Sequence, residues 1–462
     1  MKKKAVRILV LAMCLIMLVG IAACNNGDNN SSGNVDNSGN GNTDTPPVDD
    51  GPVVITYMFW GDESEVENVT GVLNAFNAEH PHIRVEPWNV DRAEIDALLN
   101  TLAATGDLPD TGFLTEQMVI DWARAGFIAS PTVVGERPLD LITFRWEGQP
   151  VAFSSANEVV LTFYNVDKFD AAGVAYPPTT AATAWSWDQF VDAAKRLTFD
   201  TSGRNALDPA FDRNNVEQYG VYIEPAPWML EAFALANGGG FFNPNDWSDV
   251  IINQPAAVEA IQRIADLHLV HGVMPQYGTL EPTIEGVLMD HAAMMINGQW
   301  SVGVWLGPAK NNAGLNYGVG VLPSMNAGNV TIATAGLAVM YEGSKHPEAA
   351  AEFLAWYASP ENNWGLIESG IWMPAVPSFY NDEAKMRQWA DNPNFPPFDQ
   401  YRSAVIEYTM SNAQSTFWYW VPGADPFLNV LGGALAPVWT GEQTAQQALN
   451  AAHGALSQAV AG

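Results

Sequence analysis

Three residues that follow the apolar run at residues 53–59 could bind a ligand. The run from Val53 to Phe59 predicts a buried strand, and Trp60, Asp62 and Glu63 come directly after it. Ligands of open α/β sheets bind beyond the carboxyl ends of the strands. A flat indole can cover an apolar ligand face while carboxylates accept hydrogen bonds from a polar rim. The chemistry that this group suits is therefore non-covalent binding.

The composition offers many more rings of this kind and few groups for covalent chemistry. The 462 residues include 17 Trp and 13 Tyr, but the only cysteines are Cys14 and Cys24. The chain beyond residue 24 therefore has no disulfide, cysteine metal site or thiol nucleophile. The sequence lacks the nucleophile-elbow, zinc-protease and phosphate-loop motifs. Isolated histidine pairs such as His80 and His82 are usually surface groups, so we expect no metal and no cofactor.

The charge of the chain excludes some classes of partner. Asp and Glu number 51 against 20 Lys and Arg, which gives a net charge of −31. A nucleic-acid binder needs clustered basic residues, and docking onto anionic lipid through charge needs them too. The acidic field would also repel a strongly anionic ligand. Neutral ligands fit best, and cationic ligands remain compatible with the sequence.

The first 23 residues are typical of an export signal. Basic residues from Lys2 to Arg7 precede an apolar stretch from Ile8 to Ala23, which is shorter than the roughly 20 residues of a membrane span. Small residues directly before Cys24 resemble the lipobox of bacterial lipoproteins. This resemblance implies that Cys24 becomes the lipidated first residue of the mature chain. The alternative is an ordinary signal peptide with an incidental cysteine.

Residues 25–52 predict a disordered tether. Asn, Gly, Asp, Ser, Thr and Pro dominate this segment, and Val35 and Val48 are its only apolar residues. Such a composition cannot offset the entropy of ordering. A flexible tether of this length spans roughly 30 Å on average. Together with the lipid at Cys24, it would hold a domain at the outer face of the bacterial membrane, which the chain meets only through its anchor.

Alternating strand and helix signals follow, and they predict an α/β fold with mostly parallel sheets. A second strand is expected at 83–86. Capping boxes at Ser64–Glu67 and Ser186–Gln189 predict helix starts. Pro at the first position favours two more helices. The predicted helices cover residues 64–76, 92–102, 186–197, 255–272, 347–357 and 442–460.

The order of short motifs from Val53 to about Ala459 resembles the sugar-binding branch of the extracellular solute-binding proteins of ABC importers, which is related to maltose-binding protein. The most specific motif is Ala-Met-x-x-x-Gly-x-Trp, at residues 293–300. The other motifs that carry the resemblance are at residues 55–60, 75–85, 105–110, 161–169, 177–190, 345–350 and 441–449.

The resemblance implies a periplasmic-binding-protein-like fold, in which two lobes close over a ligand by hinge motion. The first lobe would comprise residues 53–157 and 336–378, and the second residues 158–335 and 379–462. The implied function is a receptor, not an enzyme, which captures a neutral oligosaccharide outside the cell and docks on a membrane permease. Since the chain has no phosphate-loop motif, the ATPase must be a separate protein. We expect a monomer.

The resemblance also extends the set of candidate site residues. It places a stacking aromatic at Trp300, and it puts late site aromatics in the run that contains Trp418 and Tyr419. Two further indoles lie on loops rich in Gly or Pro, and three polar residues lie at a predicted strand end or at the first lobe crossing. These residues are Trp228, Trp372, Glu116, Asn157 and Glu158.

Two alternatives stay open on the sequence. A secreted glycoside hydrolase would use two carboxylates about 5 Å or about 6.5–9.5 Å apart, and 51 acidic residues leave ample candidates. A carbohydrate sensor or adhesin would keep the binding cleft without needing a permease. Release of reducing ends would distinguish the hydrolase from both binding functions.

Overall fold

The computed structural model describes residues 51–61, 63–129, 135–224, 226–279, 287–334 and 336–461. Residues 51–462 form one compact unit. The predicted signal segment, Cys24, the predicted tether up to residue 50 and Asp62 lie outside the described residues. Within the described part of the chain, no helix is long and apolar enough to span a membrane.

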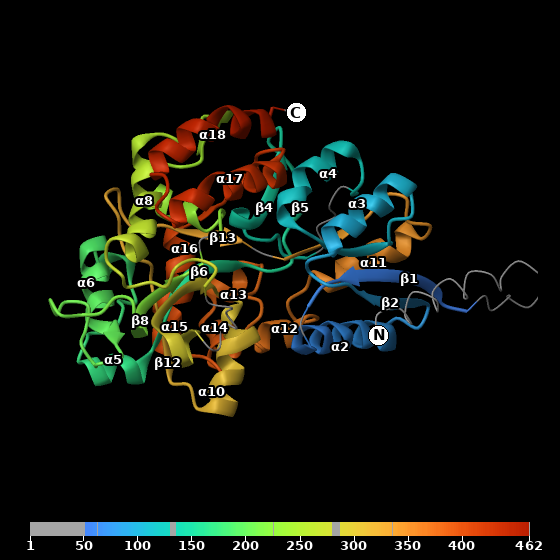
Figure 1. Cartoon of the computed structure of the whole chain (residues 1–462). Helices are drawn as coiled ribbons and strands as arrows, with labels where there is room; N and C mark the ends of the chain where they lie inside the picture. Colours follow the sequence, from blue (N-terminus) through green and yellow to red (C-terminus); the bar gives the residue numbers. More distant parts are fainter. Residues whose placement is uncertain are drawn as a thin grey trace, which may run out of the picture. The chain divides into compact units, whose positions relative to one another are not determined.

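Four described strands form the N-terminal sheet, in the order β14-β3-β1-β2. β1 (Val53–Phe59) runs parallel to β2 (Ile83–Asn89) and β3 (Thr111–Leu114), whereas β14 (Leu337–Met340) runs antiparallel to β3. α2 (Glu63–Glu79) packs against β2, and α11 (Pro347–Tyr357) packs against β1 and β14. In Figure 1 these elements lie on the right, with α2 along the lower edge.

Seven described strands form the C-terminal sheet, which is built around β6 (Glu158–Asn165). The strand order is β15-β13-β6-β11-β8-β7, and β12 also pairs with β6. Every residue of β6 is buried. The other strands of this sheet are β7 (Phe199–Asp200), β8 (Val216–Ile223), β11 (Ala292–Gly298), β12 (Tyr317–Gly320), β13 (Thr331–Thr334) and β15 (Ala413–Ser415).

Two short hairpins and the remaining helices surround the sheets. β4 (Thr143–Trp146) pairs with β5 (Gln149–Phe153), and β9 (Phe242–Asn243) pairs with β10 (Asp246–Val250). The helices are α3 (Ile95–Thr105), α4 (Val119–Ala125), α5 (Val166–Ala172), α6 (Trp187–Leu197), α7 (Leu230–Ala236), α8 (Pro255–Leu269), α10 (Gly307–Ala313), α12 (Trp364–Glu368), α13 (Ser378–Asn381), α14 (Glu383–Ala390), α15 (Phe398–Tyr401), α16 (Tyr408–Asn412), α17 (Ala424–Trp439) and α18 (Ala445–Ala459).

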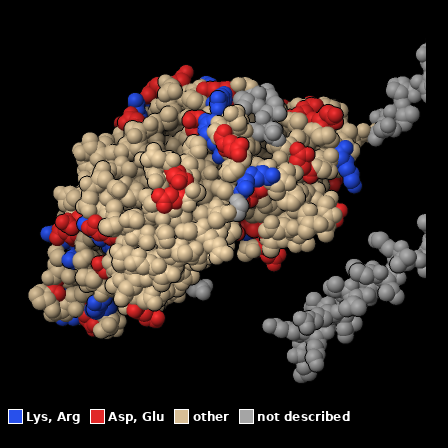
Figure 2. All heavy atoms as spheres, turned by 90° about the horizontal axis from the view of Figure 1, so that it is seen from above, with Lys and Arg blue, Asp and Glu red and all other residues tan. Residues whose placement is uncertain are grey.

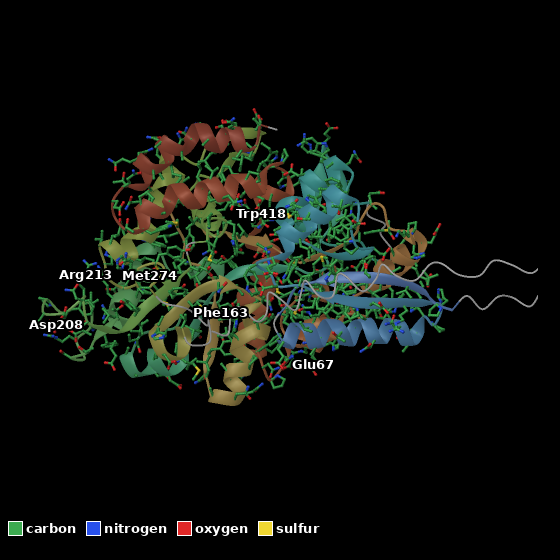
Figure 3. All side chains as sticks on the ribbon, turned by 45° about the vertical axis from the view of Figure 1, so that its right-hand side comes forward. Glu67, Phe163, Asp208, Arg213, Met274 and Trp418 are labelled. Atoms are coloured by element: carbon green, nitrogen blue, oxygen red, sulfur yellow. The ribbon has the colours of Figure 1, made fainter. Side chains whose placement is uncertain are left out.

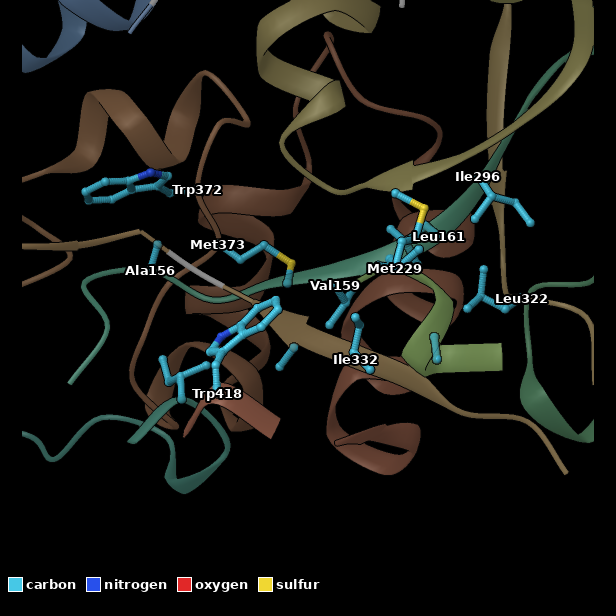
Figure 4. Close-up of a cluster of buried hydrophobic side chains, with 14 of the residues drawn as sticks. Ala156, Val159, Leu161, Met229, Ile296, Leu322, Ile332, Trp372, Met373 and Trp418 are labelled. Atoms are coloured by element: carbon cyan, nitrogen blue, oxygen red, sulfur yellow. The ribbon is translucent and has the colours of Figure 1, made fainter. Parts of the chain in front are cut away.

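Three neighbouring chain segments connect the two sheets. One enters β6 through Asn157, one leaves β13 for β14, and one contains Met373. Asn157 and Met373 exchange backbone hydrogen bonds of 3.0 and 3.2 Å, and the Ser155 amide donates to the Gly336 carbonyl at 3.0 Å. Figure 4 shows Met373 and Trp372 beside the start of β6, with Val159, Leu161 and Ile332 continuing the apolar core.

Several predicted elements are confirmed and two expectations are wrong. β1 and α11 have the predicted bounds, and α6 begins with the capping box of Ser186 and Gln189. The expected box at Ser64 fails because α2 already begins at Glu63. The expectation of mostly parallel sheets also fails, since β6 pairs antiparallel with β11, β12 and β13.

Candidate functional site

A cavity of about 610 Å³ is lined by residues of both sheets and of the segments between them. Residues after β1 and β3 form one side, and residues at the ends of β6, β11 and β13 form the other. This position fits the rule that ligands bind beyond strand ends. The lining residues are Trp60, Gly61, Glu65, Asp91, Arg92, Phe113, Leu114, Thr115, Glu116, Gln117, Glu158, Trp228, Trp300, Val304, Trp305, Thr334, Gly336, Ile371, Trp372 and Trp418.

Three indoles from different elements meet on the C-terminal side of the cavity. Trp228 precedes α7, Trp300 follows β11, and Trp418 belongs to the short helix η7 (Phe417–Tyr419). The Trp228 ring centroid lies 5.9 Å from that of Trp300 and 6.2 Å from that of Trp418. Figure 3 shows Trp418 beneath α17, and η7 packs against the N-terminal helices η1 (Glu116–Met118) and α4.

A glycine fixes the position of Trp300. A Cβ atom at Gly298 would lie 1.9 Å from the Trp300 ring, so a residue with a side chain would displace the indole. The turn between them is held by Gln299. Its side-chain amide donates to the Gly370 carbonyl and to the Tyr401 hydroxyl, both at 3.0 Å. The Gly-x-Trp part of the motif thus encodes the location of one ring.

The N-terminal side of the cavity carries a second aromatic group. Trp60 packs edge-on against Phe113, with centroids 4.9 Å apart, and the Arg92 guanidinium lies 4.9 Å from the centre of the Trp60 ring. Trp372 contacts Phe113 at 5.9 Å and is only 3% exposed. Most of the surface of Trp372 therefore packs against protein, although the residue belongs to the lining.

Burial and neighbouring acidic residues raise the pKa of one carboxyl in the lining. Glu158 is buried at the start of β6, and burial raises the pKa of its carboxyl well above the usual value. The negative charges of Glu116 and Glu65 raise that pKa further. No hydrogen bond or ion pair joins the Glu158 carboxyl to another residue in the described part of the chain.

The structure brings seven of the predicted site residues to the cavity: Trp60, Glu116, Glu158, Trp228, Trp300, Trp372 and Trp418. Three others lie elsewhere. Glu63 is exposed at the start of α2. The Asn157 amide donates to the Tyr380 hydroxyl at 2.9 Å, behind the lining. Tyr419 stacks on Phe144 and donates to the Glu116 carboxylate at 2.8 Å.

Sequence reasoning missed eight lining residues that have polar or aromatic side chains: Glu65, Asp91, Arg92, Phe113, Thr115, Gln117, Trp305 and Thr334. Glu65 and Arg92 lie on or near predicted helices, where a charged residue is usually a solvated surface group. Trp305 lies five residues after Trp300, and this spacing was the one available signal. No sequence pattern indicated that Thr334 is a site residue, because only the pairing of β13 with β6 brings it beside Glu158.

A family model described as bacterial extracellular solute-binding protein matches residues 60–364. The chain belongs to this family. Similar curated relatives are sn-glycerol-3-phosphate-binding periplasmic proteins UgpB. The one from Escherichia coli (strain K12) is 25% identical over 86% of this chain and 91% of its own length. The one from Pectobacterium atrosepticum is 25% identical over 65% of this chain and 63% of its own length.

Solved structures of two-lobe binding proteins share the fold. One is an ABC substrate-binding protein from Listeria monocytogenes in complex with cycloalternan, with a TM-score of 0.71 and 20% identity over 88% of this chain and 98% of the other. Another is the GacH receptor of Streptomyces glaucescens, studied without ligand and with acarbose, with a TM-score of 0.71 and 21% identity over the same shares. The two-lobe architecture predicted from the sequence is confirmed.

Proposed function

We propose that this protein is the extracellular carbohydrate receptor of an ABC importer. It captures an oligosaccharide between its lobes and delivers it to a membrane permease that works with a separate ATPase. The observation that carries the proposal is the cavity, in which six indoles among the described lining residues surround buried polar groups. Indole faces suit the apolar faces of sugar rings, and the polar groups suit their hydroxyls. Solved structures with this fold are titled as complexes with cycloalternan and acarbose, which supports the same ligand class.

The charge of the lining argues against an anionic solute. Glu65, Asp91, Glu116 and Glu158 line the cavity, and Arg92 is the one basic residue among the described lining residues. A phosphate in this setting would meet like charges, which weakens binding. The ligand class named for the curated relatives therefore does not transfer to this chain, and the proposed ligand is an oligosaccharide without negative charge.

The residue roles follow from position. In this proposal Trp60, Trp228, Trp300, Trp372 and Trp418 provide the ring contacts, and Glu116 and Glu158 accept hydrogen bonds from the ligand. Asn157 and Tyr419 support the site from behind the lining. The predictions for Asp62 and Glu63 stay predictions.

The proposal includes the division into lobes. Residues 53–157 and 336–378 form the first lobe, and residues 158–335 and 379–462 form the second. The strands of the two sheets and the three connecting segments support this division. Binding then closes the lobes over the cavity by rotation about the connecting segments.

The proposed location is the outer face of the bacterial cell membrane. Residues 1–23 act as a lipoprotein signal peptide, Cys24 carries the lipid, and residues 25–52 tether a monomeric receptor. The family's extracellular character supports this arrangement. The receptor itself carries out no reaction, and no cofactor is needed.

Ligand screening tests the proposal. The purified protein is titrated with neutral oligosaccharides of different linkage and with sn-glycerol-3-phosphate, while tryptophan fluorescence and melting temperature are recorded. A saturable shift with one carbohydrate class and no new reducing ends is the expected result. Reducing ends would indicate the hydrolase, and a response to glycerol phosphate alone would exclude the carbohydrate assignment.

A transport assay separates the receptor from a sensor or adhesin. Deletion of the gene in its host is expected to abolish uptake of the identified carbohydrate while leaving its intracellular use intact. Unchanged uptake would favour the non-transport alternative.

A further inference from the structure

One buried carboxyl in the cavity has no partner among the residues that the structure describes. Glu158 is only 8% exposed, it lines the cavity, and no described residue forms a hydrogen bond or ion pair with its carboxyl. Its nearest electrostatic influences are the acidic Glu116 and Glu65. A buried acidic group without a partner costs free energy, which a ligand of suitable chemistry would recover.

Two further buried polar groups beside the cavity are unpaired. Within the described residues, the Thr334 hydroxyl and the Trp418 indole nitrogen have no hydrogen-bond partner, and these residues are 4% and 1% exposed. Thr334 is the ladder partner of Glu158, so the hydroxyl and the carboxyl come from paired strands. Buried polar groups are normally paired, so these two are unsatisfied positions in residues of the lining, although neither atom is accessible in this conformation.

The one basic residue of the described lining is already engaged. The Arg92 guanidinium stacks over Trp60 and forms a 3.1 Å ion pair with Asp96. It also lies on the side of the cavity formed by the N-terminal sheet. Among the described lining residues, no uncommitted positive charge therefore remains to pair with an ionised Glu158.

The indoles of the C-terminal side suit a cation as well as a sugar ring. Trp228 lies about 6 Å from both Trp300 and Trp418, and Trp is the ring that attracts ammonium groups most strongly. Indoles together with a buried carboxylate are the chemistry that recognises a protonated amine.

We infer that the carbohydrate bound here carries a protonated amine, which binds Glu158 beside the indoles of the C-terminal side. This inference rests on the proposed function, and it narrows the proposed ligand, an oligosaccharide without negative charge, to one that carries a basic substituent. Burial and the charges of Glu116 and Glu65 raise the pKa of the Glu158 carboxyl and so favour its neutral form in the unliganded protein. An ammonium group would stabilise the ionised form and pair with it, which a neutral hydroxyl does not do.

Three matched disaccharides test the inference. Chitosan disaccharide, cellobiose and chitobiose share β-1,4-linked rings and differ at carbon 2, which carries an ammonium, a hydroxyl or an acetamide group. Their dissociation constants are measured by calorimetry at about pH 6, where the amines are protonated. The expected result is that chitosan disaccharide binds at least about tenfold more tightly than either neutral sugar.

Two variants assign the preference to one residue. Glu158→Gln should bring the three affinities within about threefold, because it removes the charge and keeps the shape. Glu67→Gln, on the exposed surface of α2 (Figure 3), removes the same charge away from the cavity and should keep the preference. If Glu158→Gln fails to fold, the order of the three affinities for the wild-type protein still tests whether an amine is preferred.

The remaining outcomes separate this inference from the function on which it rests. The inference of an amine-bearing ligand is overturned if a neutral oligosaccharide binds as tightly as chitosan disaccharide, or if the preference survives in Glu158→Gln. Either result leaves the proposed function as a carbohydrate receptor standing. Failure of every carbohydrate, amino sugars included, overturns both.

Discussion

Trp300 lies in the cavity because a glycine two residues earlier leaves room for its ring. The backbone of Gly298, the buried Gln299 amide and the indole form one small unit at the end of β11. Such a ring is held in place before a ligand arrives, so little side-chain entropy is lost on binding. Rigid aromatic anchors of this kind usually dominate binding energy.

Replacement of Trp300 therefore gives a residue-level prediction. Trp300→Ala should weaken binding of the identified ligand by about 2 kcal/mol, or roughly 30-fold, as measured by fluorescence titration. Trp88→Ala is the matched control, because Trp88 is 37% exposed on β2 and does not line the cavity. If the two substitutions weaken ligand binding equally, Trp300 does not contact the ligand.

Sequence patterns could locate residues whose neighbours lie close along the chain. Trp60 follows a strand and Trp300 ends a specific motif, so both could be assigned to a site before the fold was known. Thr334 and Glu65 could not, because distant segments bring them to the cavity. Tyr419 shows the opposite limit: the aromatic run at 416–420 indicated a site, but packing against Phe144 turns this ring away from the cavity.

At the scale of elements, α7 links two of the indoles on the C-terminal side of the cavity, Trp228 and Trp418. The Glu231 amide donates to the Trp228 carbonyl at 3.1 Å, and the Glu231 carboxyl accepts from the Phe417 amide at 3.3 Å. Trp418 follows directly. Glu231 is buried, and burial raises the pKa of its carboxyl to about 8.

The raised pKa of Glu231 predicts a pH-dependent stability. The folded protein holds this proton more tightly than the unfolded chain does. The stabilisation is therefore complete below the unfolded value near 4.5 and is lost as pH rises through about 8. Glu231→Gln should remove this loss. As pH rises from acid to alkaline, the free energy of unfolding of the variant should therefore increase by up to about 4 kcal/mol relative to that of the wild type.

Urea unfolding of both proteins between about pH 5 and pH 9 measures the effect. The quantity of interest is the difference between the two unfolding free energies, because groups common to both proteins, such as Glu158, cancel in it. A difference that stays constant across this range would contradict a neutral Glu231 in the native state.

Element types were more predictable from sequence than strand directions. Helix signals at Ser186 and Pro347 act locally, and both helices start where expected. Strand direction depends on where the chain re-enters a sheet, which no local pattern records. The segment 421–423 before α17 is similar: Gly423 adopts a positive φ, and a Cβ there would lie 2.2 Å from the Ala459 carbonyl oxygen, a contact visible only once α17 and α18 pack.

At the scale of the whole molecule, surface charge is sparse. Figure 2 shows isolated acidic side chains on one face, with few basic ones and wide areas of uncharged residues. The net charge of −31 thus comes from scattered carboxylates and from a shortage of bases. This distribution keeps the protein soluble and gives a weak attraction for cations.

Hinge closure makes a prediction at the same scale. A saturating carbohydrate should reduce the radius of gyration of the protein, measured by small-angle scattering, because the lobes rotate toward each other. The Trp300→Ala variant at equal ligand concentration serves as the control and should stay closer to the unliganded value. An unchanged radius in the saturated wild type would contradict closure of the lobes.

The late arrival of β14 in the chain has a consequence for folding during synthesis. β14 and α11 complete the N-terminal sheet, yet they follow most of the C-terminal sheet in sequence. Tyr57 of β1 contacts Phe353 and Tyr357 of α11, with centroids 5.4 Å apart in each pair. A nascent chain therefore leaves its first apolar core open until about three quarters of it has emerged from the ribosome. Until then, the apolar residues of β1 that pack against α11 lack that helix as a partner, so the N-terminal sheet cannot be completed.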